Sequence, residues 1–487
     1  MKYSIAITES VNKSMLDHLL RDNDQEDLCF ALYNLSTGKR RTTAIITKVI
    51  FPLEGDRNLH GNVSFNNEYF DRVSSIALKE SQGICLLHSH PNKGWQNMSR
   101  DDYDTESMLS SRVKAITGIP FVGLTVGLDH IWSARFWIKE APKVYNRIWC
   151  ESVRVVGRSL EVSFNDHLKS FKSLGESYNR TVSAWGEDKQ SIISRLTVGV
   201  VGLGSVGSIV VQSLQKIGIQ DIKLIDFDLV EKVNIDRLQG VSLESVGKLK
   251  VDVFKDLLDK LSVSQEFYTD AIPYSIVEEE GITNILDCDV IFSCVDMPWP
   301  RYILNEISYA NYIPVIDGGI ECSINKNHNN LDFARWKAHT VGVNRICLEC
   351  LGQYKNEDVA SEINGDFQSQ KYIDGLPKDH FINRGENVFA FSLGLASMEI
   401  HQLLSLILFP RKQFYGPKEF DFNSGNIDFD FDNHCYSSCK RKITIGEGDK
   451  VNPDLVSKHE LAEKMRSKPA KAKKTEFSNW LIKFFTR

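Results

Sequence analysis

The stretch LTVGVVGLGSVG, residues 196–207, decides the fold of the larger part of this chain. It joins a short apolar run, which predicts a buried strand, to a turn with closely spaced glycines. The pattern SIVVQSLQKIG at 208–218 then predicts a helix, and DIKLIDFD at 221–228 predicts a second strand. A strand, a helix and a strand in this order predict the βαβ unit that opens a doubly wound α/β sheet.

The glycine-rich turn also predicts a phosphate site. Gly202, Gly204 and Gly207 allow a tight turn, and the helix after them begins with free N–H groups and the positive end of its dipole. Asp226, at the end of the second predicted strand, lies where a carboxylate binds ribose. Taken alone, these residues fit a dinucleotide-binding oxidoreductase as well as an ATP-dependent enzyme.

Charged residues farther along the chain separate these two hypotheses. A nicotinamide cofactor does not need extra cations, whereas the charge of a nucleoside triphosphate must be neutralised and its Mg²⁺ held. The segments IDFDLVEKVNIDR, GKLK and SCVDMPWPR supply suitable side chains at predicted strand ends and in the loops that follow. The candidate cofactor-binding residues are Asp228, Asn234, Arg237, Lys250, Asp296 and Arg301.

This series of motifs resembles the adenylating superfamily of ubiquitin-activating enzymes and ThiF- or MoeB-type adenylyltransferases, over about residues 175–445. The resemblance implies that ATP and Mg²⁺ are cofactors. It also implies ribose binding by Asp226, phosphate binding by Arg237 and Lys250, support of the triphosphate by Asn234, and Mg²⁺ binding by Asp296. In that family the arginine of the entry segment reaches the partner subunit, so Arg180 would act across a homodimer; a plain surface arginine is the competing interpretation.

A second motif lies in GICLLHSHPNKGWQNMSRDDYD, residues 83–104. His88 and His90 lie two apart in a predicted strand, so both imidazoles point to the same side and can bind one zinc ion. Asp102 is the candidate third ligand, which would leave one position open for a catalytic water. Each part has a structural interpretation too, because strand histidines are common and Ser99 with Asp102 forms a helix capping box.

Together these residues resemble the JAMM motif of the MPN family of zinc isopeptidases. The resemblance implies that Glu26 is the general base for a zinc-bound water and that Ser99 helps to hold the oxyanion. The neighbouring Asp24 and Asp27 leave open that Glu26 is a surface carboxylate.

Paired cysteines predict a second zinc site. Cys347 with Cys350, and Cys435 with Cys439, would form a closed and therefore structural Cys₄ centre. A cysteine suited to thioester formation is not evident between the two pairs, and Cys322 is the candidate exposed thiol.

Composition limits the remaining possibilities. The 58 basic and 64 acidic residues give a net charge of -6, so we expect no nucleic-acid partner. The start of the chain does not resemble a signal peptide and the apolar runs are short, so we expect a cytoplasmic protein without a membrane contact. The expected organisation is an N-terminal α+β JAMM-type domain at 1–145, a connector at 146–175, a Rossmann-like adenylating domain at 176–445 and a polar, basic tail at 446–487.

Four functional hypotheses follow. The first is a bifunctional enzyme that adenylates the C-terminal glycine of a ubiquitin-like protein and hydrolyses (iso)peptide bonds after that glycine, with a conjugating enzyme as a further partner. The second keeps both reactions but assigns them to sulfur-carrier activation and product release in cysteine or cofactor biosynthesis. An NAD-dependent oxidoreductase and a non-catalytic binding module are the third and fourth.

Overall fold

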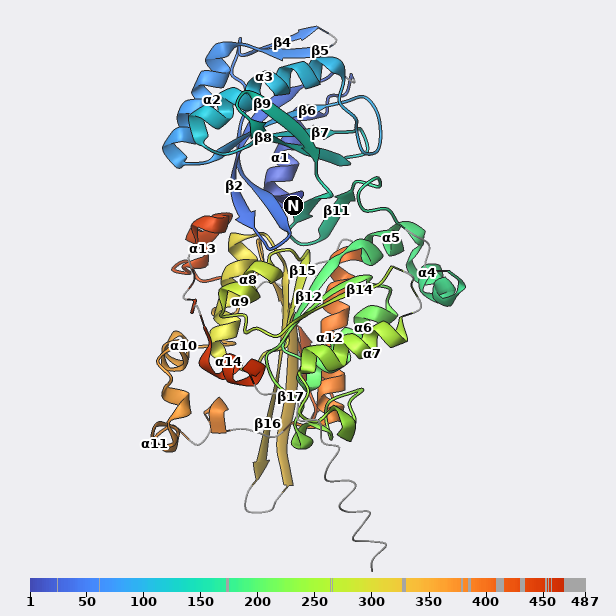
Figure 1. The fold of residues 1–487 in the computed structure, drawn as a ribbon, viewed down its shortest axis with the longest axis vertical. Helices are drawn as coiled ribbons and strands as arrows, with labels where there is room; N and C mark the ends of the chain where they lie inside the picture. The colour runs from blue at the N-terminus through green and yellow to red at the C-terminus, as the bar shows by residue number, and fades with distance from the viewer. Residues whose placement is uncertain are drawn as a thin grey trace, which may run out of the picture.

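Two sheets form the body of the chain in the computed structural model (Figure 1). The structure describes residues 1–23, 25–60, 62–171, 175–262, 264, 266–325, 330–377, 380–383, 387–408, 416–429, 434–451, 453, 455–456 and 458–467. The basic run 468–474 and the final FSNWLIKFFTR of the predicted tail lie outside the described residues.

The first sheet belongs to the N-terminal domain and has nine strands in the order β11-β10-β1-β3-β2-β6-β7-β8-β9. Its strands are β1 (Lys2–Thr8), β2 (Leu28–Thr37), β3 (Arg41–Ile50), β6 (Gly83–Ser89), β7 (Phe121–Val126), β8 (Trp132–Ala141), β9 (Val144–Trp149), β10 (Ser152–Val156) and β11 (Leu160–Phe164). Three helices pack beside it, α1 (Glu9–Leu19), α2 (Asn67–Glu80) and α3 (Arg100–Thr117), and β4 (Arg57–His60) pairs with β5 (Asn62–Phe65).

The second sheet has eight strands in the order β14-β13-β12-β15-β16-β17-β18-β19. Its strands are β12 (Thr197–Val201), β13 (Asp221–Ile225), β14 (Tyr268–Ile272), β15 (Val290–Ser293), β16 (Val315–Asn325), β17 (Asn330–Val341), β18 (Lys418–Asp421) and β19 (Ile427–Phe429). The first five strands of the series are parallel, and the chain order reverses between β12 and β15. Ligands of open α/β sheets bind at such a switch point.

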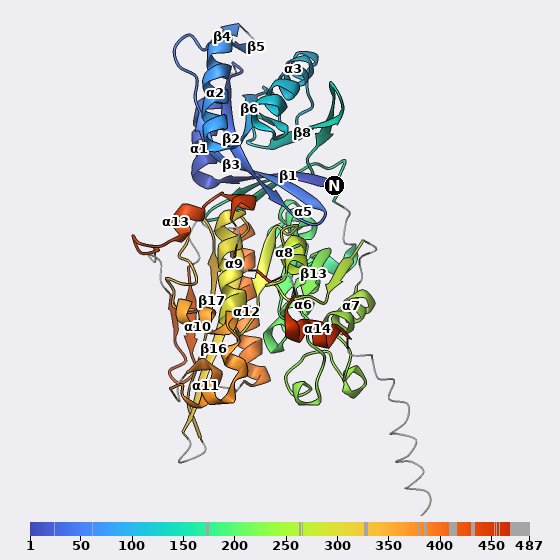
Figure 2. The same cartoon turned by 60° about the vertical axis from the view of Figure 1, so that its left-hand side comes forward.

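Helices cover both faces of this second sheet, with α8 and α9 on one side and α6, α7 and α12 on the other (Figures 1 and 2). The helices are α4 (Asn179–Trp185), α5 (Glu187–Arg195), α6 (Ser205–Lys216), α7 (Lys250–Leu261), α8 (Glu279–Ile285), α9 (Pro298–Ala310), α10 (Asn356–Ile363), α11 (Gln370–Asp374), α12 (Phe389–Leu408), α13 (Arg441–Thr444) and α14 (Glu460–Ser467). The predicted doubly wound, Rossmann-like domain is therefore confirmed.

Two expected segments differ from the structure. Residues 152–164, placed in the connector and partly expected to be helical, form β10 and β11 of the first sheet. Their position depends on the parallel pairing of β10 with β1, a contact with the other end of the domain that no local pattern reveals. The described residues of 446–467, expected as tail, pack on both domains, in part through hydrogen bonds such as those from Thr37 to Asp449, which hydrophobic periodicity does not detect.

The apolar helix α12 also differs from the expectation that every apolar run is too short to span a membrane. Among the described residues it is the one helix that is long and apolar enough, by length and composition. However, 61% of its most apolar window is buried inside the chain, where it packs on α6, β16 and β17.

The two domains meet around one buried carboxylate. Asp289, directly before β15, accepts hydrogen bonds from Arg41 Nη1 at 2.6 Å and Arg154 Nη1 at 2.9 Å, both in the first sheet. Its second oxygen accepts the backbone N–H of Thr197 at 2.9 Å, where β12 begins. Burial raises the pKa of Asp289, but the two arginines outweigh burial and hold the pKa well below its usual range.

A second carboxylate receives the tip of the hairpin that joins β2 to β3. Asp287 accepts the backbone N–H groups of Arg40 and Arg41 at 3.0 and 2.9 Å. A Cβ atom at Gly38 would lie 2.2 Å from Asp287 Oδ1, so this close approach requires glycine. The hairpin tip thus fits the second domain by its backbone.

Replacing Asp289 tests how much this contact contributes. We expect Asp289→Ala to lower the free energy of unfolding by about 3–5 kcal/mol, because it leaves two buried arginines without their partner. Asp166→Ala is the matched control: Asp166 also pairs with an arginine, Arg195, but its side chain is 80% exposed, and we expect a loss below about 1 kcal/mol. Equal losses of unfolding free energy in the two variants, measured by urea denaturation, would contradict the role of Asp289 in joining the domains.

Candidate functional site

The glycine turn between β12 and α6 has two glycines that the fold requires and one that it does not. Gly202 has a φ of 88°, and a Cβ there would lie 2.5 Å from the carbonyl oxygen of Cys294. A Cβ at Gly207 would lie 2.0 Å from the carbonyl oxygen of Gly202. A Cβ at Gly204 would meet nothing within 4 Å, and its φ of -76° suits any residue. Gly204 therefore faces open space at the N-terminus of α6, where an anion can approach the backbone.

Asp226 ties this turn to the end of β13. Its Oδ2 accepts the backbone N–H of Leu203 at 2.6 Å, and its Oδ1 accepts that of Asp228 at 2.7 Å. Burial raises the pKa of Asp226 although Lys250 acts in the opposite direction. The carboxylate is thus fixed beside the glycine turn, at the predicted ribose position.

Lys250 brings a buried cation to the same edge of the sheet. It begins α7, and its Nζ lies 2.8 Å from Asp228 Oδ2 and 3.8 Å from Asp226 Oδ2. Burial lowers the pKa of Lys250, but Asp226, Asp228 and the more distant Asp296 raise it above its usual value, so the lysine stays charged. The structure therefore brings together four predicted residues, with Asp296 exposed beyond the end of β15.

Glu362 of α10 is a residue of this edge that the sequence prediction missed. Its Oε2 accepts the backbone N–H of Trp299, at the start of α9, at 2.7 Å. Burial raises the pKa of Glu362 to about 7; the Trp299 N–H lowers the value and nearby Asp296 raises it. The segment between the cysteine pairs carried no motif that would have placed a carboxylate here.

The other predicted nucleotide ligands are engaged elsewhere or lie apart. Arg301 lies inside the domain, with its Nη2 donating to the Gly318 carbonyl at 3.0 Å and its Nε 3.4 Å from Asp317. This internal pairing, which a loop prediction could not foresee, directs the Arg301 side chain away from the role we expected. Arg237 donates to the Val233 carbonyl at 2.6 Å and its side chain is about one third exposed.

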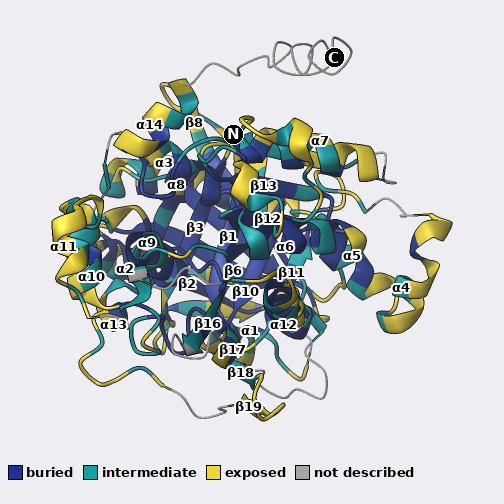
Figure 3. Cartoon of the chain, turned by 90° about the horizontal axis from the view of Figure 1, so that it is seen from below, coloured by how far each residue is buried: buried dark blue, intermediate teal, exposed yellow. Residues whose placement is uncertain are grey.

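Asn234 and Arg180 complete the set. Asn234 Oδ1 accepts the backbone N–H of Glu231 at 2.9 Å and so caps the short helix Lys232–Asn234. Arg180 is exposed on α4, a helix in which no residue is buried and which projects from the body of the chain (Figure 3). Its predicted action across a dimer stays a prediction.

The N-terminal domain gathers the predicted zinc ligands at the end of β6. The Nε2 atoms of His88 and His90 lie 3.1 Å apart, and each lies 3.3 Å from a carboxylate oxygen of Asp102. Three ligand atoms bound at about 2.0–2.1 Å and tetrahedral angles to one zinc ion would be about 3.3–3.4 Å apart. The observed spacings therefore fit a three-ligand zinc site.

Glu26 lies two residues before Leu28, the residue of β2 that pairs with His88. Burial raises the pKa of Glu26, whereas His90 and His88 lower it and Asp102 raises it. The competing Asp27 is fully buried and paired with Arg21 at 2.7 Å and Arg57 at 3.0 Å, which occupies it within the fold. Asp24 lies outside the described residues.

Helix α3 is held at the cluster by its cap and by a buried network. Ser99 Oγ accepts the Asp102 N–H at 3.1 Å, and Asp102 Oδ2 accepts the Ser99 N–H at 2.9 Å, so the capping box is present. One turn farther, buried Glu106 accepts Arg135 Nε at 3.0 Å. Arg135 also donates to Thr125 Oγ1, which lies 3.4 Å from His88 Nε2. The capping box thus fixes Asp102, and the buried network reaches His88.

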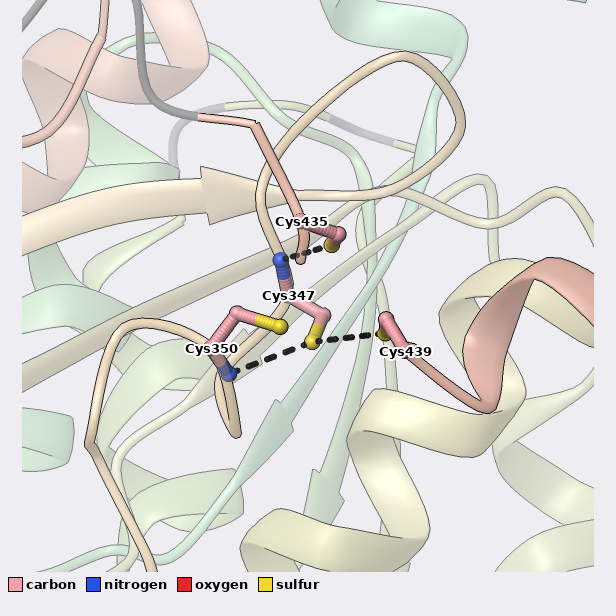
Figure 4. Close-up of side chains that lie close together, drawn as sticks. All are labelled: Cys347, Cys350, Cys435 and Cys439. Atoms are coloured by element: carbon pink, nitrogen blue, oxygen red, sulfur yellow. Dashed lines mark hydrogen bonds between the residues drawn. The ribbon is translucent and has the colours of Figure 1, made fainter. Parts of the chain in front are cut away.

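The four paired cysteines converge from two segments far apart in the chain (Figure 4). Their sulfur atoms all lie within 4.8 Å of one another, and Cys347 Sγ lies 3.7 Å from Cys439 Sγ. Sulfur atoms bound tetrahedrally at about 2.3 Å from zinc would be about 3.8 Å apart. The residues therefore fit a closed structural zinc centre. Cys322, expected to be exposed, is 6% exposed in β16, so it is not an accessible thiol.

Comparison with known proteins identifies part of the chain. Residues 178–380 match the model of the ThiF family. This segment is a ThiF-type domain. The match begins at residue 178, so the zinc-hydrolase prediction for the N-terminal domain depends on that domain's own residues.

Individual relatives are distant. The adenylyltransferase and sulfurtransferase UBA4 of Meyerozyma guilliermondii is 29% identical over 176 residues, which cover 36% of this chain and 37% of that protein. The chain therefore aligns with little more than a third of this curated relative. Escherichia coli MccB bound to MccA-N7isoAsn shares 18% identity over 55% of this chain and 74% of its own, with a TM-score of 0.42. Escherichia coli TcdA, a tRNA N6-threonylcarbamoyladenosine dehydratase, shares 22% over 31% and 66%, with a TM-score of 0.28.

The glycine turn gives a direct test of the nucleotide site in the ThiF-type domain. We expect Gly204→Ala to fold with unchanged stability, because its Cβ meets open space, but to bind Mg·ATP at least about tenfold more weakly, because the methyl group obstructs the phosphates. We expect Gly207→Ala to lower the melting temperature instead. Calorimetric titration and thermal unfolding measure both effects, and unchanged ATP binding by the Gly204 variant would place the phosphates elsewhere.

Proposed function

We propose that the ThiF-type domain activates the C-terminal carboxylate of a small sulfur-carrier or ubiquitin-like protein by attaching AMP to it. The observation that carries the proposal is the arrangement of the open Gly204 turn, Asp226, Lys250 and Asp296 at one edge of the second sheet. The adenylyltransferase and sulfurtransferase UBA4 supports the sulfur-carrier version more than protein conjugation. The buried Cys322 agrees with this preference, since a thioester requires an accessible thiol.

The proposed reaction is the transfer of an adenylyl group from ATP to the carrier's carboxylate. A carboxylate oxygen of the carrier attacks the α-phosphorus of ATP, the bond to the β-phosphate oxygen breaks, and pyrophosphate leaves with its electron pair. Lys250 and the N-terminus of α6 stabilise the charge of the phosphates, and Asp226 holds the ribose. Asp296 would hold Mg²⁺, which supplies further charge neutralisation to the triphosphate. Arg237 and Asn234 now bond within their own loop, so they would have to leave these contacts to approach the phosphates, and Arg180 would come from a second copy of the chain.

Charge at the site argues against the oxidoreductase hypothesis. Lys250 remains charged among carboxylates at the edge of the sheet, and a triphosphate can replace these carboxylates as its partner. The pyrophosphate of a dinucleotide needs only the glycine turn and the N-terminus of the helix. The buried lysine therefore favours a substrate with more negative charge.

Attachment of AMP to a carrier protein tests the adenylation proposal. Glycine-terminated β-grasp proteins from the source organism would be supplied with Mg·ATP, and we expect one of them to gain AMP, visible by intact mass. We expect Lys250→Ala to slow this step at least about 100-fold, because it removes a preorganised cation from the phosphates. Lys248→Ala is the matched control, because Lys248 is exposed in the same loop.

Two outcomes would contradict the proposal. One is full activity of both Lys250→Ala and Asp296→Ala. The other is tight binding of NAD without any binding of Mg·ATP.

A second candidate function, zinc-dependent hydrolysis of the amide after the carrier's terminal glycine, is favoured by the spacing of His88, His90 and Asp102 with Glu26 beside them. The zinc ion would supply a water with a pKa near 7. Glu26 would accept a proton from the attacking water and pass it to the leaving amine, and Ser99 would donate to the oxyanion. This part of the proposal rests on the geometry of the N-terminal domain alone.

A glutamate substitution separates hydrolysis from metal binding. We expect the native chain to hold two zinc equivalents and Glu26→Gln to keep both, while cleavage of a carrier protein with a short C-terminal extension slows about 10²–10⁴-fold. Asp102→Ala should lose one equivalent, whereas Asp101→Ala, at the exposed neighbouring position, should lose none. Elemental analysis and cleavage assays measure these effects, and wild-type cleavage by Glu26→Gln would remove the general-base role.

A further inference from the structure

The C-terminal segment returns to the carboxyl edge of the second sheet, where the proposed ATP site lies. Val456 donates its N–H to the Val277 carbonyl at 3.1 Å and forms a parallel bridge with Glu278. Helix α14 follows; it lies below α9 in Figure 1, and across the view of Figure 2 it lies between α9 and α7. We call Val456 together with residues 458–467 the C-terminal strap.

A buried ion pair anchors this strap. The guanidinium of Arg466 makes a paired contact with Glu278, at 2.8 Å from Oε1 and 3.0 Å from Oε2, and Glu278 is 2% exposed. Arg466 also donates to the Pro273 carbonyl at 3.0 Å, and its guanidinium lies 4.2 Å from the centre of the Tyr274 ring. Because such paired contacts fix both distance and orientation, the strap is held directly beyond the end of β14.

His459 points from the strap to the candidate site. Its ring centre lies 5.2 Å from that of Phe227 and 6.4 Å from that of Trp299. The backbone N–H of His459 donates to Glu278 Oε1 at 3.2 Å. Phe227 stands between Asp226 and Asp228, the residues that the glycine turn and Lys250 contact. Trp299 lies three residues after Asp296, in the first turn of α9. The His459 ring thus contacts both segments of the proposed site: the one with Asp226, the proposed ribose ligand, and the one with Asp296, the proposed Mg²⁺ ligand.

The order of the strands places the nucleoside on this side. In the proposed ATP site the phosphates would approach the turn after β12, and Asp226 at the end of the adjacent β13 would take the ribose. The base would then extend outward along the sheet edge, toward the end of β14, which is where Pro273 and Tyr274 meet the strap.

We propose that the C-terminal strap forms a wall of the nucleoside half of the nucleotide site and that His459 is a positioning residue which fixes Phe227 against the bound nucleoside. The inference rests on the proposed ATP site and names a new element of it. His459 contacts Phe227 and Trp299 and acts through them. It therefore sets the affinity for ATP and leaves the chemical step to Lys250 and Asp296.

Replacement of the ring tests this role in the full chain. We expect His459→Ala to weaken binding of Mg·ATP about three- to tenfold in calorimetric titration, since it removes an aromatic contact from Phe227. The KM for ATP should rise by the same factor while kcat stays unchanged. His459→Phe should restore the affinity to within about twofold, because it retains a planar ring. His401→Ala, at an exposed histidine of α12, is the matched control.

One truncation and one substitution in the strap give an independent measurement of ATP binding. A chain that ends after Ser467 retains the strap and should bind ATP as the full chain does, whereas Arg466→Ala releases the strap and should weaken binding. Native ATP affinity in both His459→Ala and Arg466→Ala overturns the inference. So does a loss in His459→Ala that His459→Phe does not restore. A full chain that binds no ATP refutes the proposed function itself, which separates that failure from failure of the strap.

Discussion

The contact of Asp289 with two arginines is the constraint on which the rest of the structure depends. A buried carboxylate is costly to leave without partners, and here its partners come from the first sheet on one side and from the start of β12 on the other. Asp289 itself directly precedes β15. The strands on either side of the switch point, one leading to the glycine turn and the other to Asp296, are therefore fixed at their beginnings by the same side chain.

This constraint also determines how the two candidate sites are related. Strand β2 begins next to Glu26 and ends at the hairpin whose tip meets Asp287. The zinc-ligand cluster thus lies at the far end of β2, roughly 30 Å from the domain interface for ten extended residues. Under the proposed function, a carrier protein with an adenylated terminus would have to leave the second domain before the first domain acts on that terminus. The two candidate sites are therefore separate and do not form one shared active site.

Local patterns were enough to predict the βαβ unit and which side chains converge in the two candidate metal-ligand clusters, because glycine spacing, strand alternation and cysteine pairs act over a few residues. They could not predict β10 and β11, whose place depends on pairing with β1 at the start of the chain. They also failed for Cys322, which is buried because β16 continues as a long hairpin with β17. Glu362 and His459 reach the carboxyl edge of the second sheet only through tertiary packing. The arginine partners that distinguish Asp27 from Glu26 are likewise tertiary contacts.

The central claim is that the carboxyl edge of the second sheet binds a nucleoside triphosphate. A crystal structure of the full chain with Mg²⁺ and a non-hydrolysable ATP analogue tests it most directly. The account predicts phosphates at the Gly204 turn beside Lys250, the ribose on Asp226 and the metal ion next to Asp296. A triphosphate bound at another surface, or a nucleotide that leaves Lys250 paired with Asp228 as it is now, would contradict the account.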